Sequence, residues 1–418
     1  MSDNQKNGGF HYAYVIVIAL CGIMGTAAAL TFNAAGVFYG PVSKALGVGK
    51  GTFAIYMSII CLAAALTLTF AGKVYAKVNA RTILTTAVTV IALSFFAMSR
   101  STSVYHFYVI GAFMGACQAF LLYLAVPTMI NRWFKTRTGF FLGLCSAFTG
   151  VGAVIFNPIA GSVITNSGWQ TAYLIYAIVT AVVGIPCALL ISSYPSDKGL
   201  KPFGDTGEAG TVTAAAPVTG ISYSVALKSS YFYIALLFAF AIAFVTNINA
   251  YLPSYATSLG MTLTIGATVA SASMFGNMFG KIILGIIIDK INVMAGLVVG
   301  IAGGIIGMGM MIFMGKAGVW VIMVGGFLYG VSYACNNVVV PMTIRKAFGS
   351  RDYSQIFGNV SIAAALSSTI GSSAWGFVID GTGSYALTLA VACGILVLAF
   401  VLGYAVMSMT KKVPHTAE

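Results

Sequence analysis

The sequence predicts an all-α membrane protein of twelve transmembrane helices, arranged as two pseudo-symmetric bundles of six. The first observation is composition: 59% of the 418 residues are hydrophobic and only 7% are charged, whereas a soluble domain carries about 25% charged residues. The second is that the apolar residues form continuous runs, long enough to cross a bilayer as helices of ~20 residues. The third is a set of short motifs that recur between the two halves of the chain.

The N-terminal half, residues 1–192, contains the first six apolar runs. The first run is longer than the ~7–15-residue core of a signal peptide, so we expect a spanning helix there. Because the runs are continuous rather than alternating, they favour helices over the strands of a membrane barrel. The six runs cover residues 12–39, 51–72, 82–99, 104–130, 138–164 and 169–192.

The second group of runs follows the longest polar stretch of the chain, residues 193–228. This stretch contains Asp197, Lys198, Asp205 and Glu208 and then a segment rich in Thr, Ala, Pro and Gly, a composition typical of a mostly flexible linker. Residues 229–418 form the C-terminal bundle with a short tail. Its six runs cover residues 229–252, 262–288, 294–314, 318–343, 354–379 and 384–408.

The basic residues predict the orientation in the membrane. Seventeen of the 21 lysines and arginines fall on the side that holds both termini and the 193–228 linker. The remaining four are Lys44, Lys50, Arg100 and Lys316. The positive-inside rule therefore places both termini and the linker in the cytoplasm. We expect a multi-pass protein of the cell (inner) membrane, acting as a monomer surrounded by lipid.

The composition also argues against several other functions. The net charge of +13 comes from short loops, with no basic stripe of interleaved aromatics that would predict nucleic-acid binding. The seven cysteines all lie in apolar runs without a C-x-x-C spacing, which predicts buried hydrophobes rather than metal ligands. Neither an H-E-x-x-H motif nor an embedded acid pair occurs, so we expect no enzyme and no cofactor.

Three motifs recur at nearly one offset, 212 to 214 residues. A duplicated six-helix unit explains this repetition, and carriers built from such repeats place their site between the repeats and rock one half against the other. The paired motifs are Tyr39-Gly40-Pro41 with Tyr251-Leu252-Pro253, Gly72 to Asn79 with Gly285 to Asn292, and Pro127, Phe134 and Arg137 with Pro341, Phe348 and Arg351.

The second of these motifs resembles the loop signature of the major facilitator superfamily. It reads G-K-V-Y-A-K-V-N after the second run and G-I-I-I-D-K-I-N after the eighth. The resemblance implies that Gly72 and Gly285 allow close helix packing. It also implies that Lys77, Asp289 and Lys290 latch cytoplasmic helix ends. The first copy has alanine in place of the acid, which weakens or removes its latch. Ordinary positive-inside loops would explain the lysines but not the repeated Gly and Asn.

A narrower resemblance comes from two further segments. Asn131-Arg132-Trp133-Phe134 with the glycines that follow, and the entry Phe10-His11-Tyr12-Ala13-Tyr14, are similar to the oxalate/formate antiporter and monocarboxylate transporter branch of that superfamily. The superfamily resemblance covers the whole chain, and the branch resemblance covers mainly helices 1, 4–5 and 8.

Lys281 is the one charge inside an apolar run. Ser273 and Asn277 precede it by eight and four residues, so the three share one helix face. An embedded cation costs about 2.5–3.5 kcal/mol on insertion scales and suggests a site. The alternative is a long side chain that carries its amine to the membrane surface.

The branch resemblance adds a role for this lysine. It implies a carboxylate-binding cation four positions before the loop glycine, which is where Lys281 stands relative to Gly285. A second cation of that branch would fall near Val360, and this chain has none there, which disfavours a doubly charged substrate.

The superfamily resemblance also implies that helices 1, 4, 7 and 10 line the transport cavity. On that basis we expect five further polar residues in the site: Gln118, Tyr123, Asn247, Tyr333 and Asn337. The leading hypothesis is an alternating-access carrier for a small organic anion, a monocarboxylate, with Lys281 as its counter-charge. The alternative is an efflux carrier for amphipathic compounds.

Overall fold

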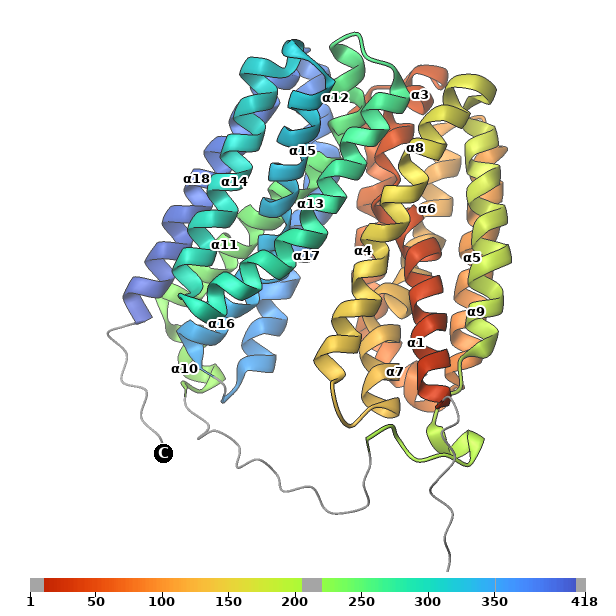
Figure 1. Cartoon of the computed structure of the whole chain (residues 1–418), viewed down its shortest axis with the longest axis vertical. Coiled ribbons are helices and arrows are strands. Elements are labelled where there is room, and N and C mark those ends of the chain that lie inside the picture. Colours follow the sequence, from red (N-terminus) through yellow and green to blue (C-terminus); the bar gives the residue numbers. More distant parts are fainter. Residues whose placement is uncertain (1–10, 205–219, 350, 411–418) are drawn as a thin grey trace, which may run out of the picture.

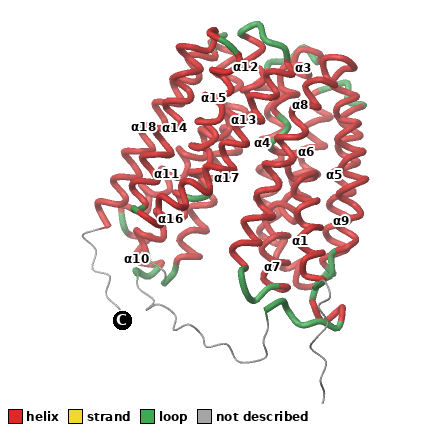
Figure 2. The backbone as a smooth tube through the Cα atoms, viewed as in Figure 1, coloured by secondary structure: helices red, strands yellow, loops and turns green. Residues whose placement is uncertain are grey.

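The computed structural model describes residues 11–204, 220–349 and 351–410 and consists of helices joined by short loops (Figures 1 and 2). Pairing of β type in these ranges is limited to two isolated bridges, Phe134 with Phe203 and Gly220 with Gly349. Several helices begin where a polar side chain accepts a hydrogen bond from a free backbone N–H of the first turn, which stabilises the helix start. Such caps are supplied by His11, Asn79, Ser103, Thr262 and Asn292.

The first group of helices lies in the N-terminal half. Its α-helices are α1 (Tyr12–Ile23), α2 (Ala29–Phe32), α3 (Gly36–Ala45), α4 (Lys50–Lys77), α5 (Ala80–Ser99), α6 (Val104–Gln118), α7 (Val126–Trp133), α8 (Thr138–Val179) and α9 (Ile185–Leu190). Short π-helical segments interrupt them at η1 (Met24–Ala28), η2 (Ala119–Ala125) and η3 (Thr180–Gly184).

The second group follows a 3₁₀ turn, η4 (Pro195–Lys198), in the described part of the linker region. Its α-helices are α10 (Tyr223–Lys228), α11 (Ser230–Thr246), α12 (Leu252–Ser258), α13 (Leu263–Lys290), α14 (Val293–Met314), α15 (Val319–Tyr333), α16 (Val339–Phe348), α17 (Tyr353–Thr382) and α18 (Tyr385–Thr410). Three 3₁₀ segments lie among them, η5 (Asn247–Tyr251), η6 (Gly315–Ala317) and η7 (Ala334–Asn336).

Eleven helical stretches of the described chain are long and apolar enough to cross a membrane. One of them, Phe140–Leu190, has 51 residues, which at ~1.5 Å per residue is more than twice the ~30 Å hydrocarbon core. Gly168 interrupts it with a φ of 84°, a backbone conformation that glycine adopts at little cost. The stretch therefore makes two crossings, and the predicted fold of twelve transmembrane helices is confirmed.

Both ends of the described chain, the start of α1 and the end of α18, lie at one end of the molecule (Figure 1). We call this the termini end. The short helices α3 and α12 lie together at the opposite end, where the two groups of helices meet. Towards the termini end the two groups diverge, so the molecule has the outline of a wedge.

A seam of close contacts joins the two groups near the opposite end. Along α4 and α17, the Ser58 and Ser372 hydroxyls lie 2.7 Å apart, and the Gly51 N–H donates to Asp380 Oδ2 at 2.8 Å. Along α8 and α13, the Ser271 hydroxyl donates to the Val154 carbonyl at 3.3 Å. Small residues and short polar side chains allow such close helix approach in a bilayer.

The predicted internal symmetry is visible in how equivalent residues are used. Tyr39 and Tyr251 occupy matching positions in the repeat and meet across the seam, with ring centroids 5.1 Å apart and nearly perpendicular planes. Pro127 and Pro341 both lie in the first turn of a short helix, α7 and α16. The two halves are therefore related as copies that face each other.

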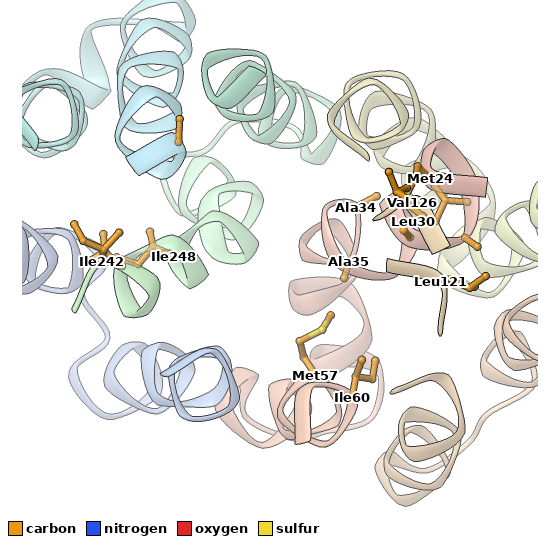
Figure 3. Packing of buried hydrophobic residues seen from close by; sticks show 14 of the residues in the cluster. Met24, Leu30, Ala34, Ala35, Met57, Ile60, Leu121, Val126, Ile242 and Ile248 are labelled. Carbon is orange, nitrogen blue, oxygen red and sulfur yellow. The ribbon is translucent and has the colours of Figure 1, made fainter. Parts of the chain in front are cut away.

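Each group buries its own apolar interior. Figure 3 shows Met24, Leu30 and Val126 gathered on the N-terminal side, and Ile242 and Ile248 on the C-terminal side. All five are at most 2% exposed. The polar residues that remain between the two groups thus stand out from apolar surroundings, and they form the candidate site.

Candidate functional site between the two helix groups

A cavity of about 400 Å³ lies between the two groups and is lined by both. Fifteen of its 22 lining residues carry hydroxyl, amide or amine groups. Six of the expected site residues line it: Tyr123, Asn247, Asn277, Lys281, Tyr333 and Asn337.

The four spans expected to line the cavity are each interrupted there. The π segments η1 and η2 interrupt the first and fourth spans, and the 3₁₀ segments η5 and η7 interrupt the seventh and tenth. All four segments supply lining residues. Such departures from α geometry occur often at functional sites and in the broken helices of transporters. Here they turn side chains such as Tyr123 and Asn249 towards the space between the halves.

Lys281 supplies the only Lys, Arg, Asp, Glu or His side chain among the residues that line this cavity. It lies on α13, nine residues before the end of that helix at Lys290. It makes no ion pair with any residue that the structure describes, and it is half-buried. An embedded cation without a counter-ion is costly, so the cavity is suited to an anion. Lys281 thus lines the space between the two groups of helices.

Three lining residues carry buried polar atoms without a hydrogen-bond partner among the described residues. These atoms are Oδ1 of Asn249, Oδ1 of Asn277 and the hydroxyl of Tyr39. Both asparagines are 7% exposed and Tyr39 is fully buried. Buried polar atoms are nearly always paired in folded proteins. Asn33, by contrast, is already engaged, since its Nδ2 donates to the Thr149 carbonyl at 3.1 Å.

The structure separates two of the expected residues from the cavity. Gln118 is fully buried, and its Nε2 donates to the Ala27 carbonyl at 2.9 Å and to the Thr31 hydroxyl at 2.8 Å. It therefore ties the fourth span to the first. Ser273 is also fully buried, because α15 crosses α13 at Gly330, where a Cβ would collide with the Ser273 backbone. Of the three polar residues on this face of α13, only Asn277 and Lys281 line the cavity.

In the conformation described here, the loop motif does not make the contacts that the resemblance implied. A Cβ at Gly72 or at Gly285 would meet nothing within 4 Å, so neither glycine makes a close helix contact in this structure. Both lie within the last six residues of their helices, α4 and α13, and these helices end on the side where the two groups diverge (Figure 1). Asp289 makes no ion pair within the described ranges, and Lys77, Asp289 and Lys290 are exposed. The implied charge latch is therefore not formed here.

The asparagine that ends each copy of the loop motif does have a clear function. Asn79 Oδ1 accepts a hydrogen bond from the Arg81 N–H at 2.9 Å and caps α5. Asn292 Oδ1 accepts from the Ala295 N–H at 2.8 Å and caps α14. The repeated asparagine is explained by this cap, which begins the next spanning helix in both halves.

The two segments that suggested the narrower branch lie together at the termini end. Trp133 Nε1 donates to the Ser192 carbonyl at 2.9 Å, and the Phe203 N–H donates to the Trp133 carbonyl at 2.8 Å. The Tyr14 ring lies 5.2 Å from the Phe203 ring and 6.4 Å from that of Phe134. These residues join the start of α1, the end of α7 and the segment after α9, away from the cavity.

Sequence reasoning missed several lining residues. Asn249 and Asn336 were visible as polar residues in apolar runs but carried no feature that set them apart. Ser146 and Thr149 on α8, and Ser368 and Ser372 on α17, were not expected in the site, although all four line it. The sequence feature that could have identified them is the spacing within each pair. Two hydroxyl residues three or four positions apart lie on the same helix face.

Comparisons with known proteins agree with this architecture. The sequence profile of the Major Facilitator Superfamily matches residues 20–318. A glucose-6-phosphate exchanger of Xenopus laevis is 33% identical over 79 residues, which is 19% of this chain and 16% of that protein. The MFS-type transporter YcxA of Bacillus subtilis (strain 168) is 24% identical over 156 residues, 37% of this chain and 38% of that protein. The chain matches well under two thirds of either relative.

Solved structures resemble the fold along nearly its whole length. A mutant of the nucleoside transporter NupG has a TM-score of 0.72 at 12% identity, and the match covers 96% of this chain and all of that one. A bacterial homologue of the human lysosomal transporter Spinster, in an inward-facing and unoccupied conformation, has a TM-score of 0.67 at 13% identity, with 96% of both chains covered. Given the profile match over more than half its length, the chain belongs to the Major Facilitator Superfamily.

Proposed function

We propose that this protein is a secondary or exchange transporter that moves a small organic anion, a monocarboxylate, by alternating access, with Lys281 binding the carboxylate. The observation that carries the proposal is the position of Lys281, which lines the cavity between the halves without an ion-pair partner among the described residues. One cation matches one carboxylate. An unpaired carboxylate in the same place would lose its hydration without compensation.

The single positive charge and the polar lining of the cavity argue against two alternative kinds of substrate, phosphate monoesters and amphipathic compounds. A phosphate monoester, such as the substrate named for the Xenopus laevis exchanger, carries close to two negative charges at neutral pH. The lining offers one cation, so a second charge would remain unpaired. Efflux of amphipathic compounds is less well supported, because most lining residues are polar and apolar walls are what such compounds prefer.

The orientation follows from the distribution of basic residues. We propose that the termini end faces the cytoplasm, so that the conformation described here is open towards the inside and closed at the seam. Reporter fusions at Glu418 and near Gly210, both outside the described residues, measure this directly. Reporters that appear on the outside of the cell would reverse the assignment.

The function is tested with the purified protein in vesicles loaded with unlabelled monocarboxylate, by uptake of the labelled compound in exchange. Removing one member of a buried charge pair costs about 3–5 kcal/mol, so Lys281→Gln is expected to lower the apparent affinity by two to three decades or more. Lys281→Arg should retain part of the activity, because the charge remains while its shape changes.

The matched control is Lys316→Gln, which removes an exposed lysine at the opposite end and should leave exchange unchanged. All variants are compared for expression and for a single peak in size-exclusion chromatography. Near-normal carboxylate exchange by Lys281→Gln would refute the assigned role of this lysine.

A further inference from the structure

We infer that the substrate is a polyhydroxylated monocarboxylate of the sugar-acid type, and that asparagine side chains of the cavity hydrogen-bond its hydroxyl groups. The inference rests on the proposed function for the carboxylate and adds the chemistry of the rest of the molecule. The first observation is that six asparagines line the cavity: Asn33, Asn247, Asn249, Asn277, Asn336 and Asn337. Each amide can both donate and accept hydrogen bonds.

The second observation is that two of these asparagines carry buried acceptor atoms that no described residue satisfies. Oδ1 of Asn249 and Oδ1 of Asn277 are buried and have no hydrogen-bond partner among the described residues. A carbonyl oxygen needs a donor, and a plain carboxylate supplies only acceptors. A substrate that satisfies both Lys281 and these amides must therefore carry a carboxylate together with O–H or N–H groups.

The charges of the lining select hydroxyl groups over an amine. An ammonium group would meet Lys281 without any carboxylate among the lining residues to balance it. Hydroxyl groups donate to the amide oxygens and accept from the amide N–H groups without adding charge. Neutral donors thus fit the cavity better than cationic ones.

The spacing sets where the hydroxyls lie relative to the carboxylate. Asn277 precedes Lys281 by four residues on α13, which places it about 6 Å away along the helix axis. Asn249 approaches from η5 in the same half, and Tyr39 approaches from α3 in the other half. A short chain that bears several hydroxyls can reach these groups while its carboxylate rests on Lys281. The volume of about 400 Å³ lies within the usual range for small-molecule sites.

The test compares four six-carbon compounds by calorimetric titration of the full-length protein in detergent: gluconate, hexanoate, glucose and glucose-6-phosphate. Gluconate has the carboxylate and the hydroxyls, hexanoate has only the carboxylate, glucose has only the hydroxyls, and glucose-6-phosphate has an additional charge. Sites that hydrogen-bond a substrate hydroxyl reject analogues that lack it. We expect gluconate to bind at least tenfold more tightly than each of the other three, and to be exchanged across vesicle membranes.

Variants at Asn249 separate the two parts of the site. Asn249→Ala removes an amide on a different element from Lys281, and should weaken gluconate binding about tenfold with little change for hexanoate. Asn166→Ala, at an exposed position outside the cavity, is the matched control and should leave both affinities unchanged. Lys281→Gln should weaken gluconate and hexanoate alike.

The outcomes distinguish this inference from the proposed function. Hexanoate binding as tight as gluconate binding, or no gluconate binding at all, would overturn the hydroxylated substrate and leave an anion carrier standing. Glucose binding equal to that of gluconate, with no effect of Lys281→Gln, would overturn both. Equal losses for gluconate and hexanoate in Asn249→Ala would contradict hydroxyl recognition by that amide.

Discussion

Among the buried polar side chains of this bundle, some bond the backbone of a neighbouring helix and others line the cavity. Gln118 and Tyr329 belong to the first kind. The Tyr329 hydroxyl donates to the Val245 carbonyl at 2.9 Å, and Gln118 bonds the first span. Asn249 and Asn277 belong to the second kind. Composition alone does not distinguish them, since an amide serves either purpose equally well.

The assignment of Gln118 leads to a prediction about stability. Gln118→Leu keeps a similar volume but removes both hydrogen bonds to the first span. A hydrogen bond contributes about 0.5–1.5 kcal/mol net, so the variant should have a lower thermal transition temperature in detergent. Substrate affinity should stay the same, because the side chain does not line the cavity. Weaker substrate binding with unchanged thermal stability would contradict this assignment and would show that Gln118 belongs to the binding site.

At the scale of elements, four of the spans that line the cavity are interrupted there, whereas α4, α13 and α17 line it as continuous helices. The spans built on α5, α14 and α18 contribute none of the lining residues, and neither does the span of η3 and α9. The first, fourth, seventh and tenth spans are interrupted at the cavity by π or 3₁₀ turns. The interruptions let backbone and side chains approach the space between the halves, whereas the uninterrupted helices α5, α14 and α18 support them from outside.

The asparagine cap that recurs at the start of α5 and of α14 can be tested separately in each helix. Asn79→Ala and Asn292→Ala should each cost about 0.5–2 kcal/mol of stability, the usual value for a lost N-cap. Asn79 should cost more, because its Oδ1 also accepts a hydrogen bond from the Ser193 hydroxyl at 3.0 Å. Thermal unfolding in detergent measures both, with Asn166→Ala as the exposed control. Transition temperatures equal to that of the control would show that the caps contribute nothing.

At the scale of the whole molecule, glycines show that the helices of the two groups touch at the seam and are separated at the termini end. Near the seam, a Cβ at Gly376 would lie 2.6 Å from the Gly51 backbone nitrogen, so these helices touch directly. Nearer the termini end, a Cβ at Gly72 on α4 or at Gly358 on α17 would meet nothing within 4 Å. Continuing the antiparallel register of α4 and α17 from the Ser58–Ser372 contact brings Gly72 opposite Gly358. Closure of the termini end would use the same kind of contact that now closes the seam.

A bulky residue at Gly358 should therefore slow the transport cycle without destabilising the fold. A Cβ at Gly358 would meet nothing within 4 Å in the conformation described here, so we expect Gly358→Leu to leave expression and thermal stability close to normal. It should slow exchange at least tenfold, because the leucine obstructs close approach of α4 and α17 at the termini end. Gly381→Leu, at an equally open position near the other end of α17, is the matched control. Unchanged exchange rates in Gly358→Leu would contradict the closing contact.

The seam itself can be locked. The Ser58 and Ser372 hydroxyl oxygens are 2.7 Å apart, so cysteines at both positions can reach the ~2.05 Å sulfur–sulfur distance of a disulfide with small adjustments. Oxidation of Ser58→Cys/Ser372→Cys should stop exchange, and a reducing agent should restore it, because alternating access requires the seam to open.

Each single variant serves as a control for that experiment. Ser372→Cys alone reveals any pairing with the native Cys61, which also lines the cavity. Full exchange activity in a double variant whose disulfide is verified by mass spectrometry would show that the seam does not open during transport.

The sequence by itself determined the twelve spans, the division into two related halves and the one embedded cation. These features are local or repetitive. A helix needs ~20 apolar residues to cross a bilayer, repeated motifs are visible at their offset, and a lysine in an apolar run is conspicuous whatever surrounds it. Helical spacing from Lys281 brought Asn277 into the expected site, and the superfamily resemblance brought in Tyr123, Asn247, Tyr333 and Asn337.

Only the tertiary structure decided which face of each helix meets the cavity. In a bilayer most faces of a helix are apolar, so the pattern of residues that orients a helix in a soluble protein is weak. Its rotation is set instead by packing and hydrogen bonding against neighbouring helices. That is why Gln118 and Ser273 proved to lie in helix contacts, why Gly72 and Gly285 stand open, and why Asn249 became visible as a site residue only in the folded chain.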